Sequence, residues 1–279
     1  MLMNLDYEPI NKAECSPPSW VAVLDIMGYK ELVRQASSNA TIAETTIGTL
    51  SDALRDVTSL WSLVGNEATD ISIISDSVCV SWGVCEMPSL GVVNDVSAIC
   101  LEFLEKGLFL KGSLAFGQHH NDGKVLFSQA FIDAYNGQED EAFYPRVLCD
   151  YSSPDPTLPG YVKSLLVSYT EVDRVNKANG HTIRFDGIWQ DCDGRFFINY
   201  LSGIDMSGDP HTAHPQSLLM RHKKLISCRL KHFQDEGNRR IAAKYGWLAS
   251  YHNRFCLSRG MSGDYMIESA PSQRPMIER

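Results

Sequence analysis

The sequence lacks the features that mark several classes of protein. No two of its eight cysteines form a Cys-x-x-Cys pair, and no histidines cluster at zinc-ligand spacing. A structural zinc site or a disulfide framework is therefore not expected. Several cysteines, such as Cys79 and Cys100, lie inside apolar runs, which predicts buried, reduced thiols. No internal repeat or low-complexity segment is present in the 279 residues.

Hydrophobic runs of membrane length are also absent. A membrane-spanning helix needs about 20 apolar residues, and the longest apolar stretches here are far shorter. The first residues, "MLMNLDYEPINKAECSPPSW", have neither the basic start nor the apolar core of a signal peptide. We therefore expect a cytoplasmic protein with no membrane partner.

Positive charge is scarce in this chain. The net charge is −9 and the calculated isoelectric point is about 5.3. Affinity for nucleic acid depends on clustered Lys and Arg, so we expect no nucleic-acid partner. A small anionic substrate would need local positive groups to overcome the overall negative field. With 44% hydrophobic residues, the chain is long and apolar enough to bury a substantial core.

Strand and helix patterns alternate along most of the chain. The run Val21 to Leu24 predicts a strand buried on both faces, and helices are predicted over 29–36 and 40–64 from apolar residues at three- and four-residue spacing. The segment "DISIISDSVCVSW", 70–82, predicts a hairpin around Ser75-Asp76-Ser77, although this turn has no glycine.

Further elements follow in the same alternating manner and predict an α+β fold. They are a helix over 93–106, a strand-turn-strand over 108–127, a short helix over 129–137, a strand over 144–150, a hairpin around Asp193-Gly194 and a long helix over 216–242. The adjacent His119 and His120 should point to opposite faces of their strand and lie exposed beside the turn, so they should not share a metal ion.

Two aspartates stand out because of where they lie. Asp25 directly follows the first buried strand, and Asp76 lies at the tip of the first hairpin. If these elements are neighbours in a sheet, the two carboxylates face one space, where they repel unless a proton or a cation intervenes. Divalent cations such as Mg²⁺ bind through carboxylates and substrate phosphates. The alternative is that Asp25 caps the next helix and Asp76 is only a turn residue.

These segments also carry a family resemblance. "VAVLDIMGYKELV" resembles the first-strand motif of class III nucleotidyl cyclases, and "ISIISDSVCVSW" resembles their second aspartate motif, in the same order. "FLKGSLAFGQHHNDGKVLFSQAFIDAYNGQEDEAFYPRV" and "KYGWLASYHN" are similar to the bacterial pyrimidine cyclases of Pycsar anti-phage systems. Motif-level similarity covers roughly residues 19–150.

The resemblance implies a cyclase-like, ferredoxin-like palm sheet with helices on one face. It implies that Asp25 and Asp76, with the backbone carbonyl of Ile26, hold two Mn²⁺ or Mg²⁺ ions. The backbone around Met27, Gly28 and Tyr29 would bind the phosphates of a nucleoside triphosphate, at the start of a helix. The product would be a 3′,5′-cyclic nucleotide that signals in anti-phage defence, made by a homodimer with sites at its interface. The implied division is an arm over 1–18, a catalytic domain over 19–205, a helical C-terminal extension over 206–262 and a loose tail over 263–279.

The sequence departs from the family pattern in two places. The lysine that reads a purine is missing from Ile71-Ser72-Ile73, which favours a pyrimidine, with UTP preferred over CTP from overall appearance alone. The Asn and Arg that steady the transition state should fall in "FIDAYNGQ", which offers Ile132, Asp133 and Asn136. The nearest basic residues are Lys111, Lys124 and Arg146. We take Lys111 and Lys124 as candidate catalytic groups and Arg146 as a candidate phosphate ligand, against surface cations and a structural ion pair as the alternatives.

Other functions remain open at this stage. A cyclase-like module that senses a nucleotide without turnover would explain the missing Asn and Arg, whereas the retained acids Asp25 and Asp76 oppose it. A cytidylate or purine cyclase would use the same machinery with another base. A diguanylate cyclase or polymerase-like palm is opposed by the absence of a Gly-Gly-Asp-Glu-Phe hairpin.

Overall fold

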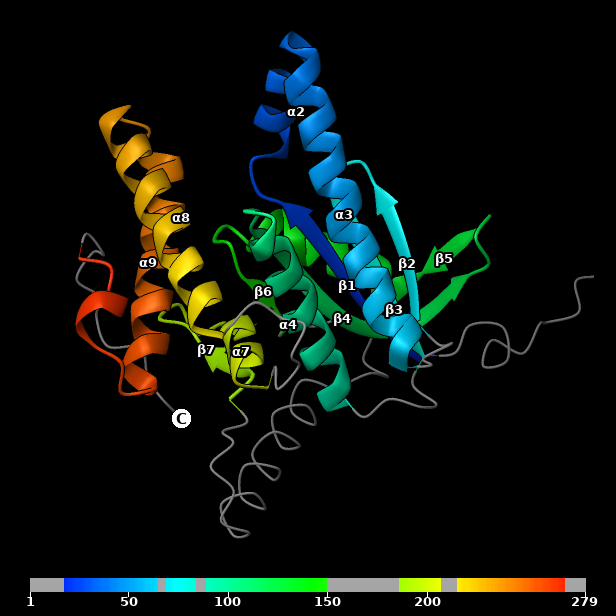
Figure 1. Cartoon of the computed structure of the whole chain (residues 1–279). Helices are drawn as coiled ribbons and strands as arrows, with labels where there is room; N and C mark the ends of the chain where they lie inside the picture. Colours follow the sequence, from blue (N-terminus) through cyan, green and yellow to red (C-terminus); the bar gives the residue numbers. More distant parts are fainter. Residues whose placement is uncertain (1–17, 65–68, 84–88, 150–185, 207–214, 269–279) are drawn as a thin grey trace, which may run out of the picture.

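The fold is a mostly antiparallel sheet with helices on both of its faces (Figure 1). The computed structural model describes residues 18–64, 69–83, 89–149, 186–206 and 215–268. The strand order is β2 (Thr69–Ile74), β3 (Ser77–Gly83), β1 (Pro18–Ile26), β4 (Leu110–Asn121), β6 (Val147–Leu148), β8 (Phe196–Ile198) and β7 (Ile188–Gln190), with β5 (Leu126–Ser128) paired to β4. The predicted α+β class is thereby confirmed at this coarse level.

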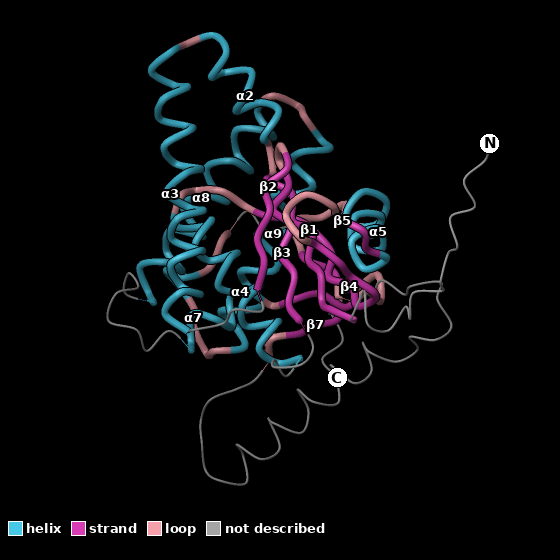
Figure 2. Tube along the Cα trace, turned by 90° about the vertical axis from the view of Figure 1, so that its right-hand side faces the viewer, coloured by secondary structure: helices cyan, strands magenta, loops and turns pink. Residues whose placement is uncertain are grey.

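The helices are arranged unequally on the two faces. They are α2 (Tyr29–Ser38), α3 (Ala40–Val64), α4 (Ser89–Glu105), α5 (Gln129–Asn136), α7 (Gly203–Met206), α8 (Pro215–Asp235) and α9 (Arg239–Ser258), with short turns η1 (Gly137–Glu141), η2 (Tyr200–Ser202) and η3 (Gly263–Tyr265). Figure 2 shows α5 on the side of the strands opposite to α3, α4 and α8. The expectation of helices on one face is therefore wrong for α5. Within the described ranges, no helix is both long enough and apolar enough to cross a membrane.

Strand β1 is central because both of its faces are apolar. Trp20, Ala22, Leu24 and Ile26 enter the main core, which the larger helical layer covers. The alternate residues Val21 and Val23 enter a smaller core with Ala115, Ala130 and Ala134, under α5. This burial on both sides confirms the prediction from the uninterrupted apolar run. Asp25 continues the alternation and so lies on the α5 face.

A glycine lets β1 and β4 approach closely near this aspartate. A Cβ at Gly112 would lie 2.3 Å from the carbonyl oxygen of Val23 and 2.8 Å from the Leu24 side chain. Gly112 faces Leu24 in the register, one position before the pair that Asp25 forms with Lys111. The close contact therefore fixes the two strands directly beside the candidate site.

The first hairpin forms without a glycine because a serine takes the left-handed conformation. Ser75 has φ of 59°, and Ile74 pairs with Ser77, which leaves Ser75 and Asp76 as the two turn residues. A short polar residue tolerates this conformation at a cost of about 1 kcal/mol. The predicted hairpin and the place of Asp76 at its tip are both confirmed.

The long helix expected over 216–242 is two helices. Gly237, at φ of 70°, ends α8, and the side chain of Asn238 accepts a hydrogen bond from the Ile241 amide at the start of α9. A glycine past a helix end and an asparagine before the next are ordinary stop and start signals. The break at Gly237 was not predicted, because apolar residues recur at helical spacing both before and after it.

Of the predicted arm over 1–18, all but Pro18 lies outside the described residues. The predicted loose tail over 263–279 is wrong for its first part, because Ile267 is buried and its amide donates to Asn253 Oδ1 at 2.8 Å. The rest of the tail, from 269 on, and the helix expected within 151–170 lie outside the described residues.

A buried hydrogen-bonded chain joins α8 to α9. His222 Nε2 lies 2.7 Å from the Tyr200 hydroxyl, and His222 Nδ1 lies 2.9 Å from His252 Nδ1. His252 Nε2 lies 2.8 Å from the Tyr265 carbonyl, which can only accept. His252 therefore donates from Nε2 and accepts at Nδ1 from His222, whose Nε2 accepts from Tyr200. Both rings are neutral in this arrangement.

Candidate functional site

The two predicted aspartates meet at one edge of the sheet. Asp25 is the penultimate residue of β1 and faces Ser77 of β3 in the register. The amide of Ile26 donates to the carbonyl of Asp76 at 2.9 Å, which ties the turn to the strand end. Burial and the charge and hydrogen bonding of the Asp76 carboxyl raise the pKa of Asp25 above its ordinary 3.8, whereas Lys111 opposes this rise. The two carboxyl groups thus share one space.

Lys111 belongs to the same group of residues. It faces Asp25 across the β1–β4 pair, and its Nζ lies 3.3 Å from Asp25 Oδ2. Both side chains are mostly buried, at 16% and 17% exposure, so their attraction is less screened than that of a surface pair. The structure thus places Lys111, a candidate catalytic group from the sequence, directly beside Asp25.

The backbone after β1 forms only part of the expected phosphate-binding turn. Gly28 takes φ of 83° and precedes the first residue of α2, Tyr29. The amides of Gly28 and Tyr29 lie where a helix start leaves donors without intrahelical acceptors. The Met27 amide, however, donates to the Phe109 carbonyl at 2.9 Å. Met27 therefore does not supply the phosphate contact that the resemblance implied, because its donor is already used.

Two other basic candidates lie elsewhere. Lys124 is exposed in the turn between β4 and β5, at the opposite end of β4 from Lys111, so one chain does not bring these lysines together. Arg146 is 2% exposed and makes ion pairs with Asp191 and Asp193. Trp247 also donates to Asp191, at 2.7 Å. Arg146 has the structural ion-pair role that was the alternative to phosphate binding, because its terminal nitrogens are already occupied by carboxylates.

The segment expected to carry the family's Asn and Arg offers no cation. Ile132 is exposed on α5, whereas Asp133 is 1% exposed and accepts from Gln129 at 2.9 Å. Of the adjacent histidines, His120 is exposed but His119 is buried, with Nδ1 2.8 Å from the Ser128 hydroxyl. The predicted alternation is correct, and the predicted exposure of His119 is wrong because β5 and α5 cover that face.

Two basic residues of α9 were missed by sequence reasoning. Lys244 Nζ lies 5.3 Å from the centroid of the Phe143 ring, and the Arg240 guanidinium carbon lies 5.9 Å from it. Burial and the charges of Lys111 and Arg240 lower the pKa of Lys244, while the charge of Asp25 raises it. Lys244 therefore lies within electrostatic range of the site. The only sequence signal was the i, i+4 spacing within "RRIAAKYGW", which does not indicate where α9 packs.

The donor set fits a divalent cation bound together with a phosphate. Mg²⁺ is usually held by one or two carboxylates, with substrate phosphates and water as its other ligands, and Asp25 and Asp76 provide two. Across the described ranges, no group of three or more His, Cys, Asp or Glu side chains forms a metal site made by protein alone. A cation here would need the substrate to complete its coordination.

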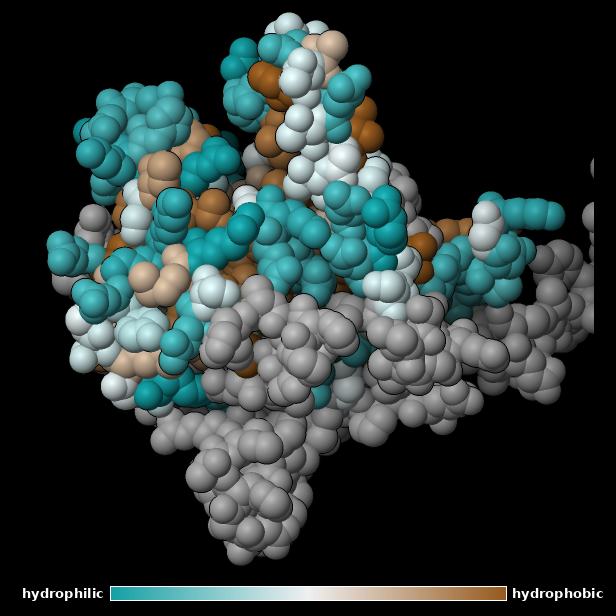
Figure 3. All heavy atoms as spheres, in the orientation of Figure 1, coloured by the Kyte–Doolittle hydropathy of each residue, from teal (hydrophilic) through white to brown (hydrophobic). Residues whose placement is uncertain are grey.

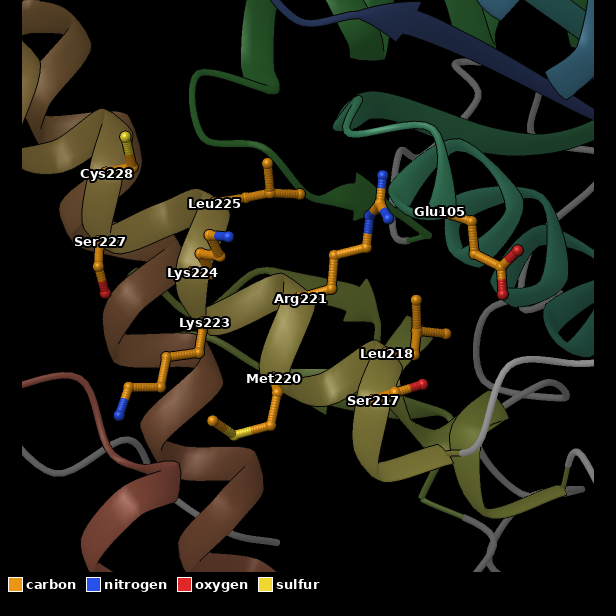
Figure 4. A pocket seen from close by; sticks show the side chains of 10 residues that line it. All are labelled: Glu105, Ser217, Leu218, Met220, Arg221, Lys223, Lys224, Leu225, Ser227 and Cys228. Carbon is orange, nitrogen blue, oxygen red and sulfur yellow. The ribbon is translucent and has the colours of Figure 1, made fainter.

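The site lies between two projecting pairs of helices. Figure 1 shows the end of β1 at the edge of the sheet, between the α2–α3 pair and the α8–α9 pair. In the space-filling view the surface is deeply notched between these pairs, and the α8–α9 tip is hydrophilic (Figure 3). A separate pocket of about 970 Å³ lies along α8, where Arg221 extends toward α4 (Figure 4). Its lining includes none of the candidate residues.

In comparisons with known proteins, no family model matches the chain, and no curated protein matches it.

Proposed function

We propose that the chain is a nucleotidyl cyclase that converts a nucleoside triphosphate to a 3′,5′-cyclic nucleotide and pyrophosphate. The observation that carries the proposal is the meeting of Asp25 and Asp76 at one sheet edge, with Lys111 3.3 Å from the first of them. Asp76 raises the pKa of the Asp25 carboxyl, and two carboxylates in one space are costly unless a cation lies between them. That arrangement is suited to phosphoryl transfer.

In the proposed reaction the 3′-oxygen of the ribose forms a bond to the α-phosphorus of the same nucleotide. The bond from this phosphorus to the oxygen bridging to the β-phosphate breaks, and pyrophosphate leaves with the electron pair. The 3′-hydroxyl proton passes to water. Two Mn²⁺ or Mg²⁺ ions held by Asp25, Asp76 and the Ile26 carbonyl would activate the attacking hydroxyl and stabilise the leaving phosphate. The chain itself binds and orients the phosphates through Lys111 and the amides of Gly28 and Tyr29.

We also propose a homodimer that uses the α5 face. Large apolar side chains are exposed there on α5, on β5 and in the turn before it, with Phe127 71%, Val125 56%, Ile132 49% and Tyr135 46% exposed. An apolar patch of this kind on a globular protein is typical of an interaction surface. This face is also the side of the sheet on which Asp25 lies, although β5 pairs with the end of β4 opposite to Lys111.

The base is proposed to be uracil, and the product a second messenger of anti-phage defence in the cytoplasm. Support for a pyrimidine is the absence of a lysine at Ile71-Ser72-Ile73, on the strand that leads to Asp76. Cytidylate or purine cyclases remain the alternatives within the same chemistry. The second candidate function is an inactive nucleotide-sensing module, which is favoured by the lack of a cation in the segment containing Asp133.

The test is direct identification of the product. The purified chain is incubated with ATP, GTP, CTP and UTP together with Mn²⁺, and cyclic nucleotides are identified by mass spectrometry. Cyclic UMP is the expected product. A purine product would retain the cyclase and remove the pyrimidine assignment. Triphosphates that bind but are not turned over would favour the sensing module.

A further inference from the structure

The C-terminal helices concentrate positive charge in an acidic protein. Between Pro215 and Arg259 lie ten of the 25 Lys and Arg residues, but only Asp235 and Glu236 of the 34 acidic ones. The remainder of the chain is therefore strongly negative. This separation places a positive field along α8 and α9, beside the edge of the sheet that carries the aspartates.

Two of these cations share one face of α9. Arg240 and Lys244 are four residues apart, so their side chains are neighbours on the helix. Both lie near the Phe143 ring, at 5.9 and 5.3 Å from its centroid, and Phe143 is itself 41% exposed. In the described part of the chain neither forms a salt bridge, whereas Arg259, which follows the last residue of α9, pairs with Asp186 at 2.9 Å.

The surroundings of Lys244 connect this face to the site. Its charge interacts with those of Lys111, Arg240 and Asp25, which come from β4, α9 and β1. Lys111, Arg240 and Lys244 thus lie beside the carboxylates of Asp25 and Asp76. The three positive charges repel one another, and the partly buried ammonium of Lys244 also loses hydration. A polyanion placed between them would relieve the repulsion.

We propose that Arg240 and Lys244 bind the β- and γ-phosphates of the nucleoside triphosphate, so that the C-terminal helices form the cationic wall of the nucleotide site. The inference rests on the proposed function. The planar guanidinium of Arg240 can make two parallel hydrogen bonds to a phosphate, and the ammonium of Lys244 acts as a point charge. Phe143 supports both cations through its ring face without neutralising them, as a carboxylate would.

Arg240 and Lys244 would also supply the positive charge for the transition state that the segment 131–138, which has no Lys or Arg, does not provide. Pyrophosphate gains negative charge as it leaves, so cations fixed near the terminal phosphates stabilise the transition state. The competing interpretation is that Arg240 and Lys244 only hold Phe143 in place. Under that interpretation, their removal alters stability but not the affinity for phosphate.

The experiment measures binding to the full chain by calorimetry with Mn²⁺, using inorganic pyrophosphate, UTP and UMP as probes. The variants are Arg240→Met and Lys244→Met, with Lys244→Arg as a charge-retaining variant. Arg239→Met is the matched control, because it removes one positive charge from the adjacent, exposed position of α9. Urea unfolding of each variant shows that the fold is kept.

We expect both methionine variants to weaken pyrophosphate and UTP binding at least tenfold. UMP binding should change less than twofold, and Arg239→Met and Lys244→Arg should bind nearly as the wild type. Pyrophosphate affinity unchanged in Arg240→Met and Lys244→Met would overturn the proposal, as would an equal loss in Arg239→Met.

Failure of the two proposals can be told apart. If the wild type forms a cyclic nucleotide and the methionine variants keep its KM and kcat, the cyclase stands and the cationic wall is wrong. If the wild type forms no cyclic nucleotide but pyrophosphate binding still depends on Arg240 and Lys244, the phosphate site stands and the cyclase is wrong.

Discussion

An aspartate at the end of a buried strand is costly, and Asp25 illustrates how the cost is distributed. Burial and the neighbouring Asp76 raise the pKa of its carboxyl, and Lys111 offsets part of the rise. Between the ordinary value of 3.8 and the higher value of the folded protein, the folded state keeps a proton that the unfolded chain has released. Stability therefore falls as pH rises through this window, and the ionised carboxylate destabilises the protein at neutral pH.

Asp25→Asn should therefore stabilise the protein at pH 7 while it abolishes the proposed activity. Loss of a metal-binding carboxylate should lower turnover by at least about 100-fold. The gain in the free energy of unfolding should disappear below pH 3.8, where the wild type is also neutral. Urea unfolding and product assays check both effects. Asp52→Asn, at an exposed pair with Arg55, is the control that should change neither. Full activity in Asp25→Asn would remove the metal assignment.

Substitution of Arg146 should have the opposite effect on stability to Asp25→Asn, because Arg146 has a structural role. Arg146→Leu leaves the buried Asp191 carboxylate without its cation, and breaking a buried pair on one side costs about 3–5 kcal/mol. Lys124→Met removes the same charge from an exposed turn and should cost less than about 0.5 kcal/mol. Denaturant unfolding of both variants tests the contrast. A stable Arg146→Leu protein that no longer binds pyrophosphate would restore the phosphate-binding assignment.

At the scale of elements, the sequence predicted what local periodicity determines. The bounds of α3 agree with the predicted 40–64, and Asp76 lies in the turn of the first hairpin, as predicted. Because β1 pairs with β3, Asp25 and Asp76 lie close together, as expected. The side of the sheet that α5 covers, and the approach of Lys244 to Asp25, depend on long-range packing. No spacing within α5 or α9 carries that information, so these features could not be derived from the sequence.

The apolar surface of β5 and α5 gives a prediction about assembly. Phe127→Glu places a charge at the most exposed of these side chains and should weaken self-association at least tenfold. Ile47→Glu on α3 is the matched control, because Ile47 is 63% exposed on the opposite helical layer. Light scattering over a range of concentrations measures the dimer. A monomeric wild type, or equal dissociation by both variants, would contradict the proposed interface.

At the scale of the whole molecule, the buried histidines make acid stability depend on the contact between α8 and α9. Burial lowers the pKa of His252 from 6.5 to about 4 and lowers that of His222 well below its ordinary value. Between about pH 4 and 6.5 the unfolded chain binds a proton that folded His252 does not. Stability is thus lost as pH falls through this window, by roughly 3 kcal/mol for His252.

Urea midpoints measured from pH 7 to 4 should decline in the wild type. His252→Gln, which removes one of the two titrating rings, should show a shallower decline. The exposed His120→Gln is the control and should follow the wild type. An identical slope in His252→Gln and wild type would mean that this ring does not titrate on unfolding.

The separation of charge between the acidic body and the basic α8–α9 pair makes the molecule an electric dipole. The proposed triphosphate is repelled by most of the surface and attracted by one edge. The electric field would therefore steer the diffusing nucleotide toward that edge. The association rate should therefore fall steeply with ionic strength, because added salt shortens the reach of the field. The rate of cyclisation of nucleotide already bound should be far less sensitive to salt. Under the proposed function, α8 and α9 would thus determine how fast the nucleotide is captured.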